Sequence, residues 1–166
     1  MQLGDWMVCL KPMDASDLPW VLATEQKAYA FPWSRRGFEL ALDQGLNAVF
    51  LSDLHDAGDL SREVKAQWQP VGYAVARAVV DEIELLNFCI HPDWQRRGLG
   101  QAALAALLAR WRAQGWTRVL LEVRPSNPAM DLYQKLGFTQ DGMRPGYYPT
   151  PTGEKEPACL MSVQLD

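Results

Sequence analysis

Polar and apolar positions near the start of the chain follow a strand period and then a helix period. This pattern predicts a strand over residues 8–13 and a helix over residues 18–29. Asp14 or Ser16 is the expected N-cap, because a short side chain with an oxygen can accept a hydrogen bond from the first helical turn. The Phe31-Pro32-Trp33 segment ends this helix, since proline cannot continue it.

A second helix and a short strand complete the first third of the chain. Ser34 is the expected N-cap of this helix, Gly45 ends it, and residues 48–51 form the strand. Residues 52–69 are acidic and polar and show no sustained period. They are therefore predicted to form an exposed loop without a chemical role.

The remainder of the chain alternates strands with helices. Residues 71–80 and 83–90 are rich in β-formers and are separated by Asp81-Glu82, which predicts an antiparallel hairpin. The elements expected after it are a helix ended by Gly115, a strand over residues 119–123, a short helix over residues 127–136 with Gly137 as its C-cap, a strand from Phe138 onward, and a closing strand over residues 158–163. This order predicts a mixed α/β fold.

Length and charge narrow the possible functions. The 166 residues fit one ordinary domain, so we expect a single domain over residues 1–166. Hydrophobic residues at 48% and charged residues at 22% are typical of water-soluble globular proteins. Sixteen Lys and Arg against 20 Asp and Glu give a formal charge of -4, so we expect no nucleic-acid partner and favour a basic or N-terminally charged substrate.

The three cysteines, Cys9, Cys89 and Cys159, are scattered and include no CxxC pair. We therefore expect buried thiols in a reducing compartment, with neither a disulfide framework nor a metal site. The N-terminal segment lacks the features of a signal peptide, and the longest apolar run, residues 102–109, is too short to span a bilayer. A cytoplasmic protein without a membrane partner is the expectation.

A glycine-containing turn between a strand and a helix forms a candidate anion site. His91-Pro92 ends the strand, and the segment from Gln95 to Gly100 leads into the helix. The first turn of a helix offers unpaired N–H groups, and glycines allow a phosphate to approach the backbone closely. The spacing excludes the usual nucleoside-triphosphate and dinucleotide motifs. Taken alone, glycines that merely ease a tight turn explain the motif equally well.

Further motifs give this turn a family context. The chain contains, in order, Gln95-x-x-Gly98-x-Gly100, Leu121-Glu122-Val123-Arg124, Ser126-Asn127, Leu132-Tyr133 and Leu136-Gly137-Phe138. This series resembles the GCN5-related N-acetyltransferase (GNAT) family over almost the whole chain. The outer strings Phe31-Pro32-Trp33-Ser34 and Tyr147-Tyr148-Pro149-Thr150 resemble the branch that acetylates the N-terminal alanine of a bacterial small-subunit ribosomal protein.

The resemblance implies the GNAT fold, a mixed and mostly antiparallel sheet flanked by helices and splayed open between the strands ending at Ile90 and Val123. Acetyl-CoA would be the co-substrate in this opening. Its pantetheine arm would pair with the backbone of Cys89, Ile90 and His91, and Asn127 would hydrogen-bond the arm. Its pyrophosphate would lie on the N–H groups of Arg97, Gly98, Leu99, Gly100, Gln101 and Ala102. The His91 side chain is interpreted as a strand-end residue without a catalytic role.

Glu122 is the candidate general base. A peptide α-amine has a pKa of about 7.7 to 8.0, so near neutral pH it must lose a proton before it attacks. Desolvation in the apolar strand around Glu122 would raise the pKa of this carboxyl and suit it to that task. The alternative is a structural glutamate paired with Arg118 or Arg124. Glu82 and Glu84 are competing bases, because some members of the family carry the base on that strand.

Tyr133 is the candidate general acid, at the position where the family's tyrosine protonates the departing CoA thiolate. Alternatively, its ring only covers the core. The backbone at the end of the Ile90 strand is the candidate oxyanion donor. Acetyl transfer through Cys89 is disfavoured, because no base near it in the sequence would activate the thiol. We therefore expect direct transfer in a ternary complex.

Five aromatic residues flank the expected mouth of the site, namely Tyr29, Phe31, Trp33, Tyr147 and Tyr148, and the last four are the candidates to position the first side chains of a peptide. Taken singly, each is more commonly a packing residue. The resemblance implies transfer to the N-terminal alanine of a small-subunit ribosomal protein. The rival interpretations are a small-amine or lysine acetyltransferase on the same fold and a non-catalytic CoA-sensing module.

Overall fold

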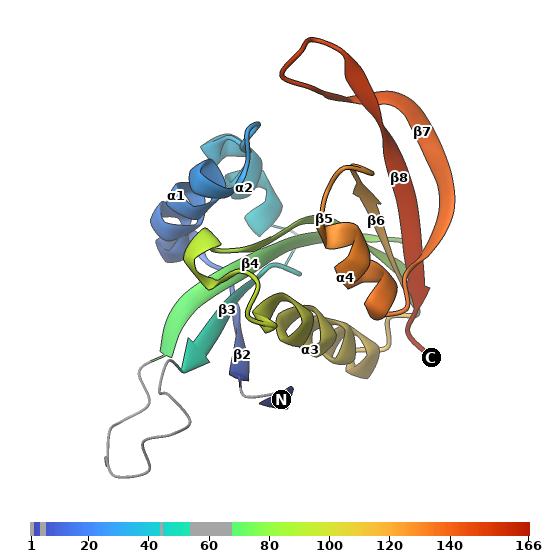
Figure 1. Ribbon diagram of the computed structural model, residues 1–166. Coiled ribbons are helices and arrows are strands. Elements are labelled where there is room, and N and C mark those ends of the chain that lie inside the picture. The colour runs from blue at the N-terminus through green and yellow to red at the C-terminus, as the bar shows by residue number, and fades with distance from the viewer. Residues whose placement is uncertain (1, 4–5, 44, 54–67) are drawn as a thin grey trace, which may run out of the picture.

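The computed structural model describes residues 2–3, 6–43, 45–53 and 68–166 (Figure 1). The strands are β1 (Gln2–Leu3), β2 (Trp6–Pro12), β3 (Ala48–Asp53), β4 (Trp68–Val79), β5 (Glu82–Ile90), β6 (Arg118–Val123), β7 (Thr139–Pro149) and β8 (Lys155–Gln164). The helices are α1 (Leu18–Ala28), α2 (Arg35–Leu42), α3 (Leu99–Ala113) and α4 (Ala129–Lys135), with single 3-10 turns η1 (Ala15–Asp17) and η2 (Pro92–Trp94).

The strands form one sheet in the order β1-β2-β3-β4-β5-β6-β8-β7. All neighbouring strands are antiparallel except β5 and β6, which run parallel and are joined through α3. Pairing between β5 and β6 extends from Glu82 and Arg118 to Leu85 and Leu121, and there it ends. We call the region beyond this point, between residues 86–90 and the end of β6, the β5–β6 opening. The predicted mixed and mostly antiparallel sheet is confirmed.

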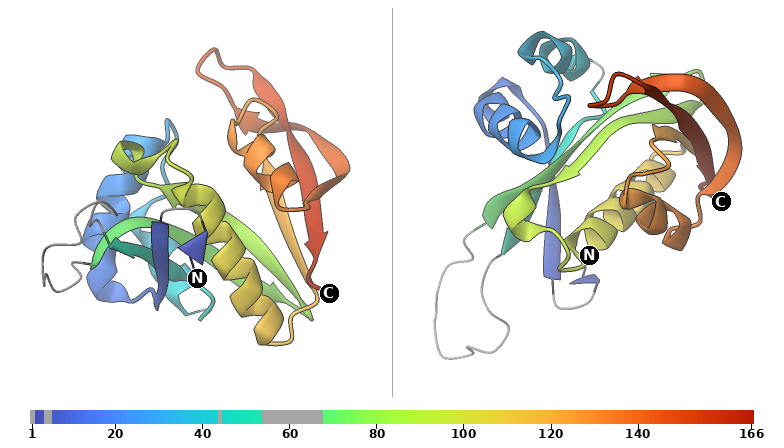
Figure 2. Two further views of the ribbon diagram at one scale, coloured as in Figure 1. Left: turned by 60° about the horizontal axis from the view of Figure 1, so that its bottom comes forward. Right: turned by 45° about the horizontal axis from the view of Figure 1, so that its top comes forward.

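Helices cover both faces of the sheet, with α1 and α2 on one face and α3 and α4 on the other (Figures 1 and 2). Leu18, Val21 and Phe38 pack with side chains of β3, β4 and β5 under the first pair of helices. Leu104, Leu107 and Trp111 belong to the larger core under α3 and α4. Because both faces of the sheet are covered, residues 71–76 of β4 are all buried, rather than alternating between buried and exposed positions.

The first helices begin at the predicted capping residues. Asp14 accepts the N–H of Ser16 at 2.8 Å and caps η1, from which α1 continues. Ser34 accepts the N–H of Gly37 at 3.2 Å at the start of α2. Within the described residues, no helix is both long and apolar enough to cross a membrane.

The loop expected over residues 52–69 is shorter than predicted. Ser52 and Asp53 continue β3, and β4 already begins at Trp68. Ser52 is fully buried, and its hydroxyl donates to the carbonyl of Met7 at 3.2 Å, so a polar residue can extend the strand without an unsatisfied group. The rest of the expected loop, residues 54–67, lies outside the described residues.

The turn between β4 and β5 also differs from the prediction by one residue. Val79 pairs with Glu82, so the turn consists of Val80 and Asp81. Val80 has a φ of 60° and is 95% exposed, an unusual position for a β-branched residue. The register of β4 and β5 therefore places Val80 in the turn, although valine is usually found in strands.

Candidate active site

The backbone of Ile90 faces the β5–β6 opening. His91 donates its N–H to the carbonyl of Val71 at 2.8 Å, which directs the backbone groups of alternate residues toward β4. By this alternation the N–H and carbonyl of Ile90 point to the opposite side, and the carbonyl accepts the Gln95 side-chain amide at 2.8 Å. Among the residues expected to pair with the pantetheine arm, Ile90 therefore presents its N–H to the opening. The N–H of His91 does not, because it is bonded to the Val71 carbonyl.

The loop before α3 has the backbone geometry of an anion-binding nest. Arg96 has a φ of 60° and Gly98 a φ of 83°, with Arg97 between them. Left-handed residues in such a loop turn successive N–H groups toward one point. The Arg97 guanidinium lies 4.8 Å from the centre of the Trp94 ring and adds positive charge beside the loop. The left-handed Arg96 was not foreseen, because side-chain type alone does not indicate it.

The first turn of α3 extends this anion site. Gly98 is the N-cap and has no side chain to accept a hydrogen bond, so the N–H groups of Leu99, Gly100 and Gln101 have no partner within the helix. Ala102 differs from the expectation, because its N–H donates to the carbonyl of Gly98 at 3.1 Å. The N–H groups available to a phosphate thus end one residue earlier than predicted.

Gly100 and Asn127 lie where the opening meets α4. A Cβ added to Gly100 would stand 3.5 Å from Ile90 Cγ1 and 3.5 Å from Leu132 Cδ2, so a larger side chain there would enter this junction. Asn127 accepts the N–H of Ala129 at 2.9 Å through its Oδ1. This bond satisfies the first N–H of α4, and among the described residues the Asn127 amide nitrogen remains available to donate to a ligand.

His91 has the structural surroundings expected of a strand-end residue. Its Nδ1 accepts the N–H of Asp93 at 3.2 Å and so caps η2. Its ring stacks on Trp20 with the ring centres 6.1 Å apart.

Glu122 lies on the face of the sheet that carries α1 and α2. Val119 and Leu121 belong to the core under α3, and side chains alternate along a strand, so Glu122 points the other way. Its Oε1 lies 3.0 Å from Nη2 of Arg144, and its side chain is 21% exposed. The carboxylate is therefore neither unpaired nor fully buried. The alternative interpretation, in which Glu122 pairs with Arg118 or Arg124, is wrong about the partner. These two arginines pair with other carboxylates.

The competing bases lie at the opposite end of β5 from the opening. Glu84 pairs with Arg77, with Nε and Oε2 2.6 Å apart, and Glu82 pairs with Arg118 at 3.2 Å. Both glutamates belong to the part of β5 that is still paired with β6. Their position favours Glu122 as the base.

Tyr133 projects from α4 and is 7% exposed. Its ring contacts Phe138, with centres 5.6 Å apart, while its hydroxyl makes no hydrogen bond to any described residue. Burial, followed by nearby Tyr148 and Cys89, raises the pKa of this phenol above its usual value. The phenol thus stays protonated near neutral pH, and its neighbours place it between β7 and β5.

Tyr148 links the candidate acid to the candidate base. Burial, followed by the negative charge of Glu122 and by Tyr147, raises the pKa of Tyr148 to about 12. Since Tyr148 also acts on Tyr133, it lies near both groups. Tyr148 thus has the candidate base and the candidate acid in its neighbourhood, at the end of the sheet where β5 and β6 are no longer paired.

Arg124 joins two aromatic residues that were predicted to bind substrate. Its guanidinium lies 5.7 Å from the centre of the Phe31 ring and 4.5 Å from that of Tyr148. The same side chain donates to the Pro149 carbonyl at 2.8 Å and to Glu156 at 2.8 Å, which holds the β7–β8 hairpin. We call the surface formed by Phe31, Arg124 and Tyr148 the acceptor mouth.

The other two predicted aromatic residues have different surroundings. Trp33 is half-buried and packs on Phe38, with ring centres 5.5 Å apart, so its ring belongs largely to the layer of α1 and α2. Tyr147 is 43% exposed and contacts both Tyr148 and Arg144. It therefore lies at the rim of the acceptor mouth.

The cysteines support direct transfer. Cys89 is buried, and burial raises the pKa of its thiol to about 12, so little of the reactive thiolate is present near neutral pH. The three cysteines are free, as expected, but Cys9 is exposed rather than buried. Among the described residues, no cluster of three or more acidic, histidine or cysteine side chains could hold a metal ion.

Glu25 was missed by the sequence analysis although it is 1% exposed. It follows the buried residues Leu18 and Val21 at spacings of seven and four, which places it on the core-facing side of α1. This spacing was the available signal. Arg144 and Glu156 gave none, because their partners are distant in sequence.

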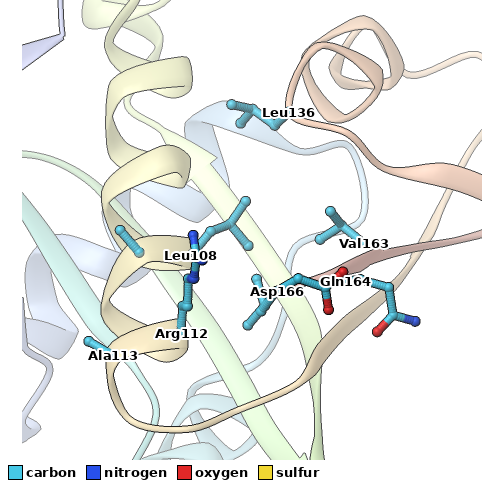
Figure 3. Close-up of a pocket in the computed structure, with 9 residues that line it drawn as sticks. Leu108, Arg112, Ala113, Leu136, Val163, Gln164 and Asp166 are labelled. Carbon is cyan, nitrogen blue, oxygen red and sulfur yellow. The ribbon is translucent and has the colours of Figure 1, made fainter.

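A separate hollow lies away from these residues. It has a volume of about 580 Å³ and is formed by the C-terminal half of α3, Leu136 after α4, and the end of the chain. Figure 3 shows Leu108 and Arg112 on one side and Val163 and Asp166 on the other. None of the candidate site residues lines it.

Comparison with known proteins places the chain among acetyltransferases. The family model described as the acetyltransferase (GNAT) family matches residues 20–138. A [ribosomal protein bS18]-alanine N-acetyltransferase of Escherichia coli is 34% identical over 96% of this chain and 99% of its own. The corresponding protein of Haemophilus influenzae is 32% identical over 96% of this chain and 100% of its own. The crystal structure of the E. coli ribosomal-protein-S18-alanine N-acetyltransferase superposes with a TM-score of 0.80 at 33% identity, covering 96% of this chain and 95% of that one.

Proposed function

Because this chain belongs to the acetyltransferase (GNAT) family, we propose that it transfers the acetyl group of acetyl-CoA to the N-terminal alanine of a small-subunit ribosomal protein. The observation that carries the chemistry is the position of Glu122 at the β5–β6 opening, with Tyr148 near both this carboxylate and the phenol of Tyr133. The similarity to the bS18-alanine N-acetyltransferases over nearly the whole chain supports the substrate. We assign the reaction to one catalytic domain in the cytoplasm.

The opening has the donors that acetyl-CoA requires. The N–H groups of Leu99, Gly100 and Gln101, together with the nest before them, suit the pyrophosphate. The Asn127 side-chain amide suits a polar group of the pantetheine arm. Bound acetyl-CoA supplies an acetyl group activated as a thioester.

Glu122 and Tyr133 divide the proton transfers between them. Glu122 accepts a proton from the substrate ammonium, and the neutral nitrogen forms a bond to the acetyl carbon. The Ile90 N–H is placed to stabilise the negative charge that develops on the carbonyl oxygen. As the carbon–sulfur bond breaks, Tyr133 donates its proton to the thiolate. The nitrogen loses a second proton as the amide forms; of its two protons, one replaces the proton given up by Tyr133 and the other is released, so net transfer yields the amide, CoA and one proton.

The acceptor mouth suits a peptide N-terminus. Its ammonium carries a single positive charge next to Glu122, while the rings of Phe31 and Tyr148 can contact the first side chain. The overall charge of -4 favours approach of a basic ribosomal protein. Direct transfer needs no acetylated enzyme, consistent with the protonated thiol of Cys89.

The proposal is tested with peptides that differ only in their first residue. The purified chain is incubated with acetyl-CoA and Ala-, Ser-, Met- or Gly-initiated peptides, and intact masses are measured. The Ala-initiated peptide should gain one acetyl group on its α-amine. Spermidine and a blocked peptide with an internal lysine serve as controls, and their acetylation without that of the Ala-initiated peptide would show a small-amine or lysine acetyltransferase. Tight binding of acetyl-CoA with no CoA released on any substrate would indicate a CoA-sensing module.

A further inference from the structure

The buried carboxylate of Glu25 connects three elements around the site. Its Oε1 accepts the backbone N–H of Trp33 at 2.8 Å. Its Oε2 accepts the Tyr73 hydroxyl and the Asn87 side-chain amide, the latter at 3.1 Å. These donors come from the turn between α1 and α2, from β4 and from β5. Within the described residues Glu25 makes no ion pair, so these hydrogen bonds alone satisfy the carboxylate.

The part of β5 that Glu25 contacts lies in the β5–β6 opening. Asn87 lies two residues beyond Leu85, the last residue of β5 that is paired with β6. A second hydrogen bond ties α1 to the same stretch, because the Tyr29 hydroxyl donates to the Phe88 carbonyl at 2.7 Å. The end of α1 is thus anchored to the strand that carries the Ile90 N–H.

The turn held by Glu25 carries one wall of the acceptor mouth. Phe31 stands two residues before Trp33 and is 49% exposed. Across the mouth it contacts Arg124, which in turn contacts Tyr148. The position of Phe31 relative to Tyr148 therefore depends on the Trp33 N–H remaining bonded to Glu25.

We propose that Glu25 is a positioning residue that fixes Phe31 in the acceptor mouth and thereby sets the preference for a small first residue. This inference rests on the proposed function. A buried carboxylate suits the task, because it accepts several hydrogen bonds at once and is costly to leave unsatisfied. The turn is consequently held in one position, and Phe31 with it.

Glu25→Gln perturbs this turn selectively. Glutamine has the same size but only one oxygen, which is best used by the two donors, Tyr73 and Asn87. Its NH2 group then faces the N–H of Trp33, and two donors cannot bond each other. The turn should move while the contacts to the sheet remain. Tyr73→Phe is the matched control, because it removes one donor and leaves the Trp33 hydrogen bond intact.

The measurement is the ratio of kcat/KM for an Ala-initiated peptide to that for a Leu-initiated peptide, with the Kd for acetyl-CoA alongside. In Glu25→Gln this ratio should fall at least tenfold, mainly through a higher KM for the Ala-initiated peptide. The Kd for acetyl-CoA should stay within twofold, and Tyr73→Phe should keep the wild-type ratio. A purely structural role predicts equal losses for both peptides, and that result would overturn the proposal.

Two further results keep the test decisive. If Glu25→Gln does not fold, Glu25→Asp is measured instead, because its shorter side chain cannot reach both Trp33 and the sheet. An unchanged ratio in the folded Glu25→Asp variant would equally overturn the proposal. The wild-type enzyme tests the proposed function separately, since its failure to acetylate the Ala-initiated peptide would refute that function regardless of any variant.

Discussion

Replacing Tyr133 by phenylalanine should lower the rate of acetyl transfer and leave the stability of the fold nearly unchanged. The substitution removes the hydroxyl and retains the ring that packs on Phe138. Because this hydroxyl makes no hydrogen bond to a described residue, the fold loses no hydrogen bond with it. The reaction, in contrast, loses the proton donor for the thiolate.

The magnitudes follow from these two roles. Loss of one general acid lowers turnover by roughly 10²-fold or more, which corresponds to about 2.7 kcal/mol in the activation free energy. The free energy of unfolding should change by less than about 0.5 kcal/mol, or roughly 1–2 °C in Tm for a chain of this size. Tyr29→Phe is the matched control. It removes a hydroxyl that donates to Phe88 at 2.7 Å but gives no proton to the thiolate, so it should lower stability by about 0.5–1.5 kcal/mol and lower kcat far less than Tyr133→Phe does.

Steady-state kinetics with the Ala-initiated peptide, acetyl-CoA affinity and thermal unfolding test this pair. The active form of Tyr133 is the protonated one, and burial raises the pKa of this phenol above its ordinary value near 10. Activity that depends on it is therefore present below that pKa and lost only as pH rises through it, so this group should cause no decline in kcat up to about pH 9. Wild-type kcat in Tyr133→Phe would remove Tyr133 from the mechanism.

Three further predictions concern the base, the anion site and the thiols. Glu122→Gln should lower kcat roughly 10²- to 10⁴-fold with peptide binding largely retained, whereas Glu84→Gln should not, and the reverse outcome would move the base to β5. Gly100→Val should weaken acetyl-CoA binding at least tenfold, about 1.4 kcal/mol, as measured by calorimetry; unchanged affinity in the folded variant would contradict the anion site. Alkylation at pH 8 should modify exposed Cys9 but spare Cys89, because burial raises the pKa of the Cys89 thiol to about 12; intact mass gives the number of labels, and rapid labelling of Cys89 would reopen a covalent route.

Local signals in the sequence predicted much of the architecture. Periodicity and caps such as Ser34 identified the helices, because a capping side chain acts within one turn. The ends of the strands were predicted less accurately, as the positions of Ser52 and Val80 show. Their environments depend on Met7 and on the register of the β4–β5 hairpin, neither of which is local.

The candidate site was predictable where a motif lies within one segment. The turn around Gly98 and the strand around Glu122 are continuous stretches, so their residue types and spacing are visible in the sequence. The pairing of Glu122 with Arg144 and the hydrogen bonds of Glu25 join residues far apart in the chain. Only the folded sheet brings such partners together, so the sequence alone could not identify them.

We propose that this enzyme acetylates the α-amine of an N-terminal alanine on a ribosomal protein. The most direct test is incubation of full-length unacetylated bS18 with the enzyme and acetyl-CoA, followed by tandem mass spectrometry to locate the modification. We expect one acetyl group, on the α-amine of the N-terminal alanine, and its loss when Glu122→Gln replaces the wild type. Acetylation confined to lysine side chains, or an unmodified N-terminus beside active turnover of a small amine, would contradict the claim.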